Sequence, residues 1–234
     1  MSKNVNWLEG LAEDVVKDVV EKISAKKVKN EAYVVQSRPA DSKTESLSEK
    51  NRKAHQELME GYVKSLNEIS AKLDSVDREG VTPNSGDFRA LKSDEAYNLN
   101  AAFLHGLFFE NIGDPNSRLT TDSLSFMRLE RDWGSFDQWQ KDFIACCLAA
   151  RNGWAVTCYN TFLKRYMNVV VNLHSGDVPM GCIPIIVVDC WEHSYYSDYL
   201  KDRKSYVFEM MKEFRWNKIE ERFEAAEQIG RVMK

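Results

Sequence analysis

The stretch VVDCWEHSYYSDY, from Val187 to Tyr199, decides the fold. It continues an apolar, β-branched run that begins at Ile183 and is typical of a buried strand. Asp189 ends this run, and His193 follows four residues later among aromatic side chains. A carboxylate and an imidazole at the mouth of a buried strand are suited to bind one metal ion. An Asp that caps a helix, followed by a half-exposed His, explains the same spacing equally well.

The chain has only three other histidines, and each has a definite place in the pattern. His55 and His105 lie within segments with helical periodicity, and His174 lies in a loop before the third expected strand. Imidazoles and carboxylates that converge from separate elements are common metal donors. Taken alone, His55 in its polar stretch is typical of a surface histidine, and His105 is typical of a core histidine with a hydrogen-bond partner.

The composition indicates a soluble globular protein. Of the 234 residues, 43% are hydrophobic and 29% are charged. No apolar run approaches the roughly 18 to 20 residues that a membrane helix needs. The net charge of −4 argues against a general nucleic-acid binder.

The N-terminal segment is interrupted by acidic residues and has no Arg before Arg38, unlike a secretory or mitochondrial leader, which predicts a cytoplasmic location. Five cysteines without CxxC spacing predict buried, reduced thiols.

Hydrophobic periodicity predicts a largely helical chain with one small sheet. The helices are expected at about residues 4–27, 48–73, 94–110, 121–132, 135–150, 198–214 and 216–233. Three short strands are expected within TCYN, NVVVNL and PIIVVD. This order predicts an α+β fold in three parts. Residues 1–46 form an added amphipathic helix and linker, residues 47–118 an α-hairpin domain, and residues 119–234 an α/β domain with a three-stranded antiparallel sheet.

Several motifs resemble the iron/manganese superoxide dismutase family. DCWEHSYYSDY is similar to the family's metal-ligand signature DxWEHxYYxDY, and DWGSFDQWQKDF at 132–143 is similar to its GSFDxFxxxF helix. NAAFLHGLFFENI at 100–112 resembles the segment that carries a ligand histidine. NGWAV at 152–156, RWNKIEERFEAA at 215–226, LSEKNRKAH and YVKSLN resemble further segments in the family's order. The resemblance covers about residues 47–226.

The resemblance implies a ligand set and an activity. The ligands would be His55, His105, Asp189 and His193, holding one iron or manganese ion that disproportionates superoxide to dioxygen and hydrogen peroxide. Residues 47–118 would then be the metal-binding hairpin. His174, in the HSGDVP loop, resembles the histidine with which a subset of the family replaces a conserved glutamine. A loop histidine in solvent is the alternative. That variant occurs with both metals, so the resemblance leaves iron and manganese open.

The resemblance also implies roles for residues around the metal. Tyr62 is similar to the family's gateway tyrosine, and Trp154 and Trp191 are similar to aromatic residues that wall the metal. Aromatic side chains at such spacing are more often plain core. Glu192 resembles a residue that reaches the partner chain's ligand histidine, and Tyr196 lies in the same segment, so a homodimer is expected.

Some positions depart from the family. Met59 stands where a gateway histidine is common, Phe109 replaces a common tryptophan, and Ala101 stands where many relatives carry the glutamine, which leaves room for His174. The missing gateway histidine and the unusual N-terminal segment favour an alternative, a structural or assembly protein on the same fold with residues 4–27 docked to a protein partner. The complete ligand set opposes that alternative. Three His and one Asp would also suit the zinc ion of a hydrolase, but no general base for hydrolysis is evident at the site.

Overall fold

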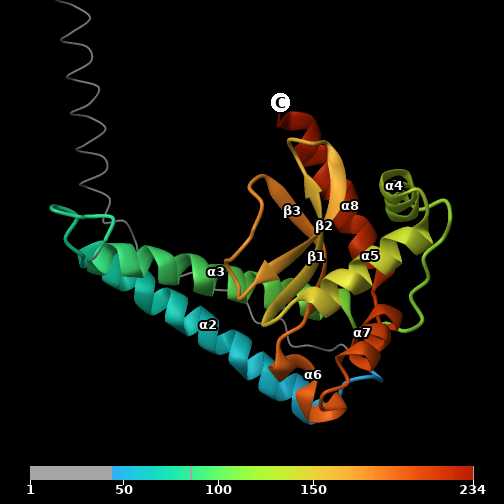
Figure 1. Ribbon diagram of the computed structural model, residues 1–234, viewed down its shortest axis with the longest axis horizontal. Helices are drawn as coiled ribbons and strands as arrows, with labels where there is room; N and C mark the ends of the chain where they lie inside the picture. Colours follow the sequence, from blue (N-terminus) through green and yellow to red (C-terminus); the bar gives the residue numbers. More distant parts are fainter. Residues whose placement is uncertain (1–43, 85, 234) are drawn as a thin grey trace, which may run out of the picture. The chain divides into compact units, whose positions relative to one another are not determined.

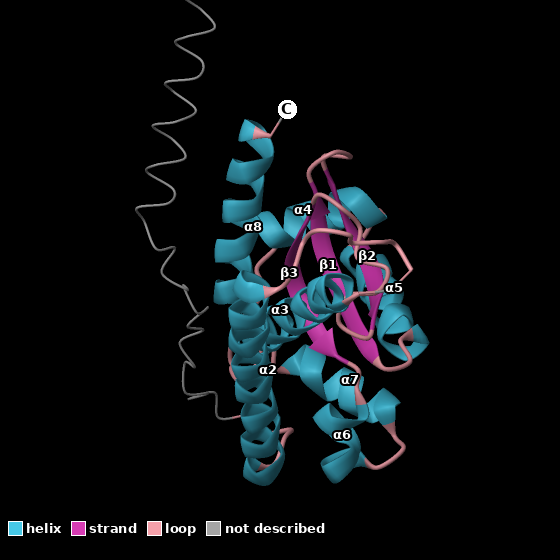
Figure 2. Ribbon diagram, turned by 90° about the vertical axis from the view of Figure 1, so that its left-hand side faces the viewer, coloured by secondary structure: helices cyan, strands magenta, loops and turns pink. Residues whose placement is uncertain are grey.

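The computed structural model describes residues 44–84 and 86–233 (Figure 1). Two long helices, α2 (Glu49–Ser75) and α3 (Asp87–Asn111), lie side by side as a hairpin (Figures 1 and 2). The other elements are α4 (Leu124–Trp133), α5 (Phe136–Ala149), β1 (Gly153–Asn160), β2 (Arg165–Asn172), β3 (Cys182–Asp189), α6 (Glu192–Tyr199), α7 (Arg203–Lys212) and α8 (Trp216–Val232).

This architecture confirms the α+β class with its hairpin and three-stranded sheet. The amphipathic helix predicted at residues 4–27, and the linker as far as residue 43, lie outside the described residues. Within the described ranges, no helix combines the length and the apolar character that a membrane crossing requires.

Helix α2 shows why His55 is buried despite its polar neighbours. Ser48 caps the helix by accepting a hydrogen bond from the Asn51 N–H at 3.1 Å. The buried residues then recur at intervals of three, four or seven positions, at Asn51, His55, Met59, Leu66, Ile69 and Leu73. His55 is 1% exposed because it belongs to this stripe. The spacing along the helix, and not the local polarity, determines its burial.

The C-terminal helices differ from the prediction. One helix was expected at about residues 198–214, but α6 already starts at Glu192 and ends at Tyr199, and α7 is a separate helix. Leu200 interrupts the helical path because its backbone is left-handed, with φ of 52°. Asp202 then starts α7 by accepting from the Ser205 N–H at 3.1 Å. Likewise α3 begins at Asp87, earlier than the expected Asp94.

The sheet has the order β2-β1-β3 with both pairs antiparallel. Trp154 lies opposite Asp189 on β3 and opposite Val171 on β2, so these three side chains share one face of the sheet. The other face packs against α5 and α8: the Trp139 indole N–H donates to Thr157 Oγ1 at 3.0 Å, and the rings of Tyr166 and Phe223 are 4.5 Å apart.

A buried polar clamp fixes α3 to the sheet. Asn111, in the last turn of α3, donates from Nδ2 to the Val187 carbonyl oxygen at 3.1 Å. Arg222 of α8 donates to Asn111 Oδ1 and to the Ile185 carbonyl oxygen, the latter at 3.1 Å. The clamp therefore joins the helix that carries His105 to the strand that ends at Asp189.

Replacing Asn111 with Ala should destabilise the protein by about 2–4 kcal/mol, because the change leaves buried hydrogen-bonding groups on Val187 and Arg222 without their partner. Urea denaturation followed by circular dichroism measures the free energy of unfolding. The matched control is Asn116→Ala, at an exposed turn position, which should stay within about 0.5 kcal/mol of the parent. Equal stability of the two variants would contradict the clamp.

Candidate metal centre

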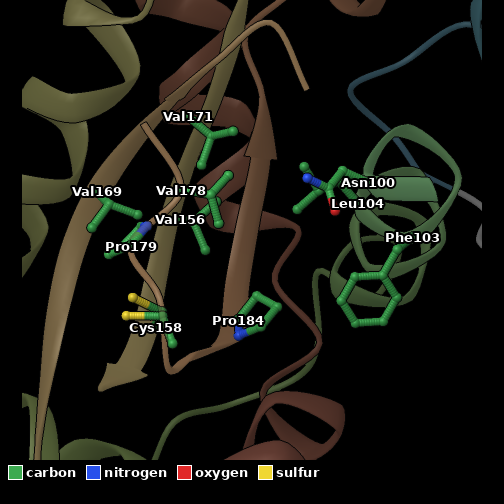
Figure 3. A pocket seen from close by; sticks show the side chains of 11 residues that line it. Asn100, Phe103, Leu104, Val156, Cys158, Val169, Val171, Val178, Pro179 and Pro184 are labelled. Carbon is green, nitrogen blue, oxygen red and sulfur yellow. The ribbon is translucent and has the colours of Figure 1, made fainter. Parts of the chain in front are cut away.

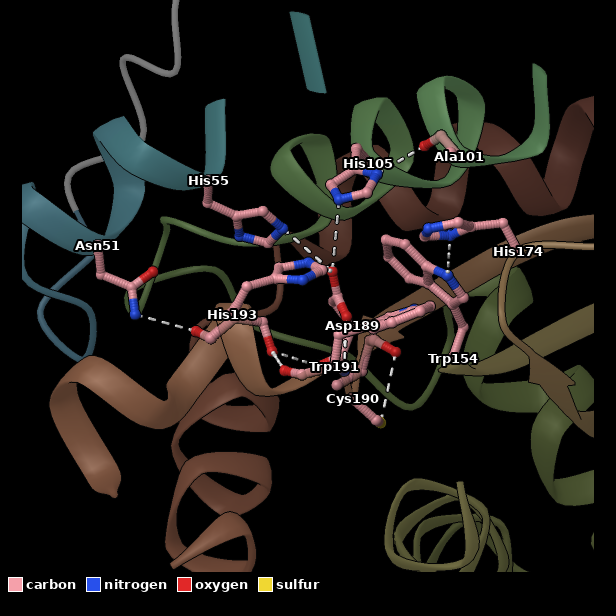
Figure 4. Close-up of polar contacts among 12 residues, drawn as sticks. Asn51, His55, Ala101, His105, Trp154, His174, Asp189, Cys190, Trp191 and His193 are labelled. Atoms are coloured by element: carbon pink, nitrogen blue, oxygen red, sulfur yellow. Dashed lines mark hydrogen bonds and ion pairs between the residues drawn. The ribbon is translucent and has the colours of Figure 1, made fainter. Parts of the chain in front are cut away.

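Three histidines converge on one carboxylate oxygen (Figure 4). The Nε2 atoms of His55 and His193 lie 3.0 and 3.1 Å from Asp189 Oδ2. Nε2 of His105 lies 3.6 Å from the same oxygen. One donor atom from each residue falls within 4.8 Å of the others. The sequence singled out these same four residues, and the structure brings all of them together.

Each of the four side chains comes from a different element. His55 lies on α2, His105 on α3, Asp189 at the last position of β3 and His193 in the first turn of α6. The first three are at most 1% exposed, whereas the His193 side chain is 26% exposed. Asn51 ties α2 to α6 through hydrogen bonds from Nδ2 to the Ser194 carbonyl oxygen and to the Ser197 hydroxyl. The cluster therefore depends on packing between elements that are distant in sequence.

The main chain around Asp189 leaves only one carboxylate oxygen for the histidines. Oδ1 accepts a hydrogen bond from the Trp191 N–H at 2.8 Å. The Asp189 carbonyl oxygen accepts from the hydroxyls of Tyr206 and Ser194, at 2.8 and 3.0 Å. These bonds hold the end of β3 rigidly and direct Oδ2 into the cluster. Asp189 is thus not the N-cap of α6, which is Trp191.

The tautomer of His105 makes the cluster suited to a cation. Its Nδ1–H donates to the Ala101 carbonyl oxygen at 2.6 Å, so in the neutral ring Nε2 carries a lone pair. That lone pair faces the carboxylate of Asp189, and no donor among the described residues meets it. Two acceptors that face each other repel unless a positive ion lies between them.

Protonation does not relieve this repulsion. Burial, with a further contribution from His55, lowers the pKa of His105 to about 3, and burial also lowers the pKa of His55. Burial alone would raise the pKa of Asp189, but hydrogen bonds from His193 and His55 outweigh it and hold that pKa well below its usual value. The site at neutral pH therefore presents an ionised carboxylate to the neutral imidazoles of His55 and His105, and these are donors typical of a transition-metal site.

The distances agree with this interpretation. Nitrogen and oxygen donors about 2 Å from an ion, and about 90–120° apart around it, are separated by about 2.8–3.5 Å. The observed separations of 3.0, 3.1 and 3.6 Å match that spacing. The residues present therefore fit a single first-row metal ion.

His174 lies beside the cluster, fully buried. It is 0% exposed, and burial lowers its pKa to about 4, so the ring is neutral. The Trp154 indole N–H donates to Nδ1 at 3.0 Å, which places the remaining proton on Nε2. Nε2–H then donates to the Tyr62 hydroxyl oxygen at 3.0 Å. The ring also stacks on Trp191, with centroids 5.0 Å apart.

Tyr97 was not among the residues predicted from the sequence. This residue of α3 lies beside His174, with ring centroids 4.7 Å apart, and its ring centroid lies 6.3 Å from that of Tyr62. Tyr97, Ala101 and His105 follow one another at intervals of four, about one turn each, so they lie along one face of α3. This four-residue spacing was the signal in the sequence that could have identified Tyr97. A tyrosine on a helix is, however, also typical of an ordinary hydrophobic core.

The structure also places the remaining residues that were singled out from the sequence. Met59 is 3% exposed on the buried stripe of α2. The Phe109 ring lies 5.0 Å from the ring of His55. Glu192 and Tyr196 are exposed on α6, one turn apart, with His193 between them in sequence.

Three histidines and an aspartate between a helical hairpin and a three-stranded sheet define a mononuclear metalloprotein. Residues 123–222 match the family described as "Iron/manganese superoxide dismutases, C-terminal domain". The chain is 31% identical over 194 residues to the superoxide dismutase [Fe] of Aquifex aeolicus, covering 81% of this chain and 90% of that protein. It is 32% identical over 173 residues to the superoxide dismutase [Mn] of Haloarcula marismortui, covering 73% and 81%. The chain therefore belongs to the iron/manganese superoxide dismutase family.

The lowered histidine pKa values predict how the stability of the metal-free protein depends on pH. His105 is neutral in the folded state down to about pH 3, whereas in the unfolded chain it is protonated below its ordinary value of 6.5. The unfolded state therefore binds the proton first, and stability falls as the pH decreases from about 6.5 toward 4. Urea denaturation of the metal-free protein at pH 7.5, 6 and 5 measures this loss. In His105→Gln the loss should be smaller, and an equal loss would contradict the assignment.

Proposed function

We propose that the protein is a superoxide dismutase that holds one iron or manganese ion per chain through His55, His105, Asp189 and His193. The observation that carries this proposal is the convergence of three imidazole nitrogens on Asp189 Oδ2. When bound, such an ion supplies one-electron redox chemistry, in which one superoxide is oxidised to dioxygen and the next is reduced to hydrogen peroxide. Relatives named for iron and for manganese support either metal.

The protein's own part in this reaction is to supply protons, because formation of each hydrogen peroxide consumes two. Burial, aided by Tyr97 and Asp189, raises the pKa of Tyr62 well above its ordinary value, so its hydroxyl keeps its proton at neutral pH. Since His174 Nε2–H already donates to the Tyr62 oxygen, the Tyr62 hydrogen is directed elsewhere. The Tyr62 hydroxyl is thus a proton donor oriented by its neighbours.

We propose that His174 takes the place of the glutamine that many relatives carry near the metal. Trp154 fixes the ring through Nδ1, and the ring in turn fixes Tyr62 through Nε2. Met59 has no proton to transfer, unlike the gateway histidine it replaces. Proton delivery therefore passes through Tyr62, which lies beside Tyr97, while Trp154 and Trp191 line the site and exclude water.

We also propose that the chain forms a homodimer through α6. Glu192 and Tyr196 are exposed one turn apart, and Tyr196 is 53% exposed although its ring is largely apolar. In a dimer, Glu192 would accept a hydrogen bond from His193 of the partner subunit. The expected domains, residues 47–118 and 119–234, would each supply two of the four ligands. We further propose that the protein is cytoplasmic and that residues 4–27 bind a protein partner.

Replacing Asp189 with Ala should empty the site. It removes the only negatively charged donor, so bound metal should fall below about a tenth of an ion per chain and dismutation should disappear. Elemental analysis and a superoxide-consumption assay on protein loaded with iron or manganese measure both. The matched control is Asp94→Ala on the exposed side of α3, which should keep metal and activity.

Two outcomes would contradict the proposal in different ways. Stoichiometric metal in Asp189→Ala would refute the ligand assignment. A metal-filled parent protein that does not consume superoxide would refute the activity, and would favour the structural or assembly role.

Replacing Glu192 with Ala should weaken the proposed dimer by at least about tenfold in Kd, because it removes a charged partner from a buried contact. Light scattering coupled to size-exclusion chromatography measures the mass across a dilution series. Glu224→Ala, at an exposed position of α8, is the matched control and should leave the mass unchanged. A parent protein that is monomeric at micromolar concentration would rule out the dimer.

A further inference from the structure

A cavity lies apart from the histidine cluster, between α3 and the sheet (Figure 3). Its volume is about 160 Å³, and its walls are mainly apolar side chains such as Leu104, Val156 and Pro184. None of the four candidate ligands lines it. Two of its lining residues are the thiols Cys158 and Cys182, and Figure 3 shows two sulfur atoms side by side in its wall.

A third sulfur atom lies on the same face of the sheet. Cys158 of β1 pairs directly with Met167 of β2. Asn160, two residues further along β1, pairs directly with Cys182 of β3. Because residues two apart in a strand point to the same side, three neighbouring strands each place one sulfur-bearing side chain on this face.

Asn160 holds the sulfur atoms together. Its Nδ2 lies 3.3 Å from Cys182 Sγ and 3.9 Å from Met167 Sδ. Cys182 and Cys158 line the same wall of the cavity, and their thiols interact. The amide cannot turn away, because Asn160 Oδ1 accepts from the N–H groups of Phe162 and Leu163 at 3.0 and 2.9 Å. An N–H donor fixed toward sulfur stabilises negative charge there.

We propose that Cys158, Cys182 and Met167 form a binding site for a soft monovalent cation of the Cu(I) type. Thiolate and thioether donors select such ions over the harder metals that histidine and carboxylate prefer. Binding displaces the thiol protons to solvent, and two thiolates with one thioether then surround the cation. Cys182 is partly exposed, so the cavity gives the ion a path from solvent.

The surroundings favour a soft-metal site over a reactive thiol. Reactive cysteines need a neighbouring positive charge that stabilises the thiolate. The residues that line this cavity include no Lys, Arg or His. Cys158 is 1% exposed, and burial raises its pKa well above the ordinary value. Without a cation Cys158 therefore remains a thiol, and a bound cation compensates for the charge of its thiolate.

The test is a Cu(I) titration of the full-length protein with its own metal in place. The protein is titrated under anaerobic conditions in competition with the chromogenic chelator bicinchoninate. The parent should retain one Cu(I) per chain. Cys158→Ala/Cys182→Ala should lose it, and Met167→Leu should bind at least about tenfold more weakly. Cys146→Ala, which removes a partly exposed thiol on α5, is the matched control and should bind like the parent.

X-ray absorption at the copper edge identifies the donor atoms. Sulfur neighbours in the parent, with one fewer in Met167→Leu, would support the site. Loss of all Cu(I) to bicinchoninate by the parent, equal retention in the double variant, or a shell of nitrogen alone would overturn it. Circular dichroism checks that each variant is folded, and the single variant Cys182→Ala, at a partly exposed position, provides the same test if the double variant is not.

Discussion

The structure depends on one buried carboxylate oxygen, Asp189 Oδ2, and the three imidazole nitrogens that face it. A buried charge is costly unless it is fully compensated. Oδ1 is satisfied by the Trp191 N–H, so Oδ2 must find its compensation within the cluster. Packing of the hairpin against the sheet brings His55 and His105 to it, and α6 brings His193. The fold therefore holds four donors at spacings that suit a metal ion.

Much of this arrangement was predictable from the sequence, because it depends on local patterns such as helix caps and apolar runs. Ser48 and Ser135 cap the helices that they were expected to begin, and the three apolar runs form the three strands. The motif around Asp189 identified two of the donors, and the family resemblance identified the other two. The five cysteines are free thiols, of which Cys146 and Cys182 are only partly buried.

What the sequence did not reveal depends on tertiary contacts. The polar neighbours of His55 concealed its burial, which follows from its position on the stripe of α2. The break between α6 and α7 comes from the left-handed backbone of Leu200, a residue type that gives no warning of it. Tyr97 was missed because its importance arises only where α3 meets the loop of His174. Local secondary-structure propensity carries no information about such tertiary contacts.

The wide separation of the donors along the chain has a consequence for how the protein acquires its metal. His55 and Asp189 are 134 residues apart, and His193 follows still later. On a ribosome, the first imidazole is synthesised long before the carboxylate, and no nascent chain that stops short of His193 contains the complete set. Metal capture is therefore a late event, which follows synthesis and docking of the hairpin on the sheet. The ion that enters is selected from the pool that the finished protein meets.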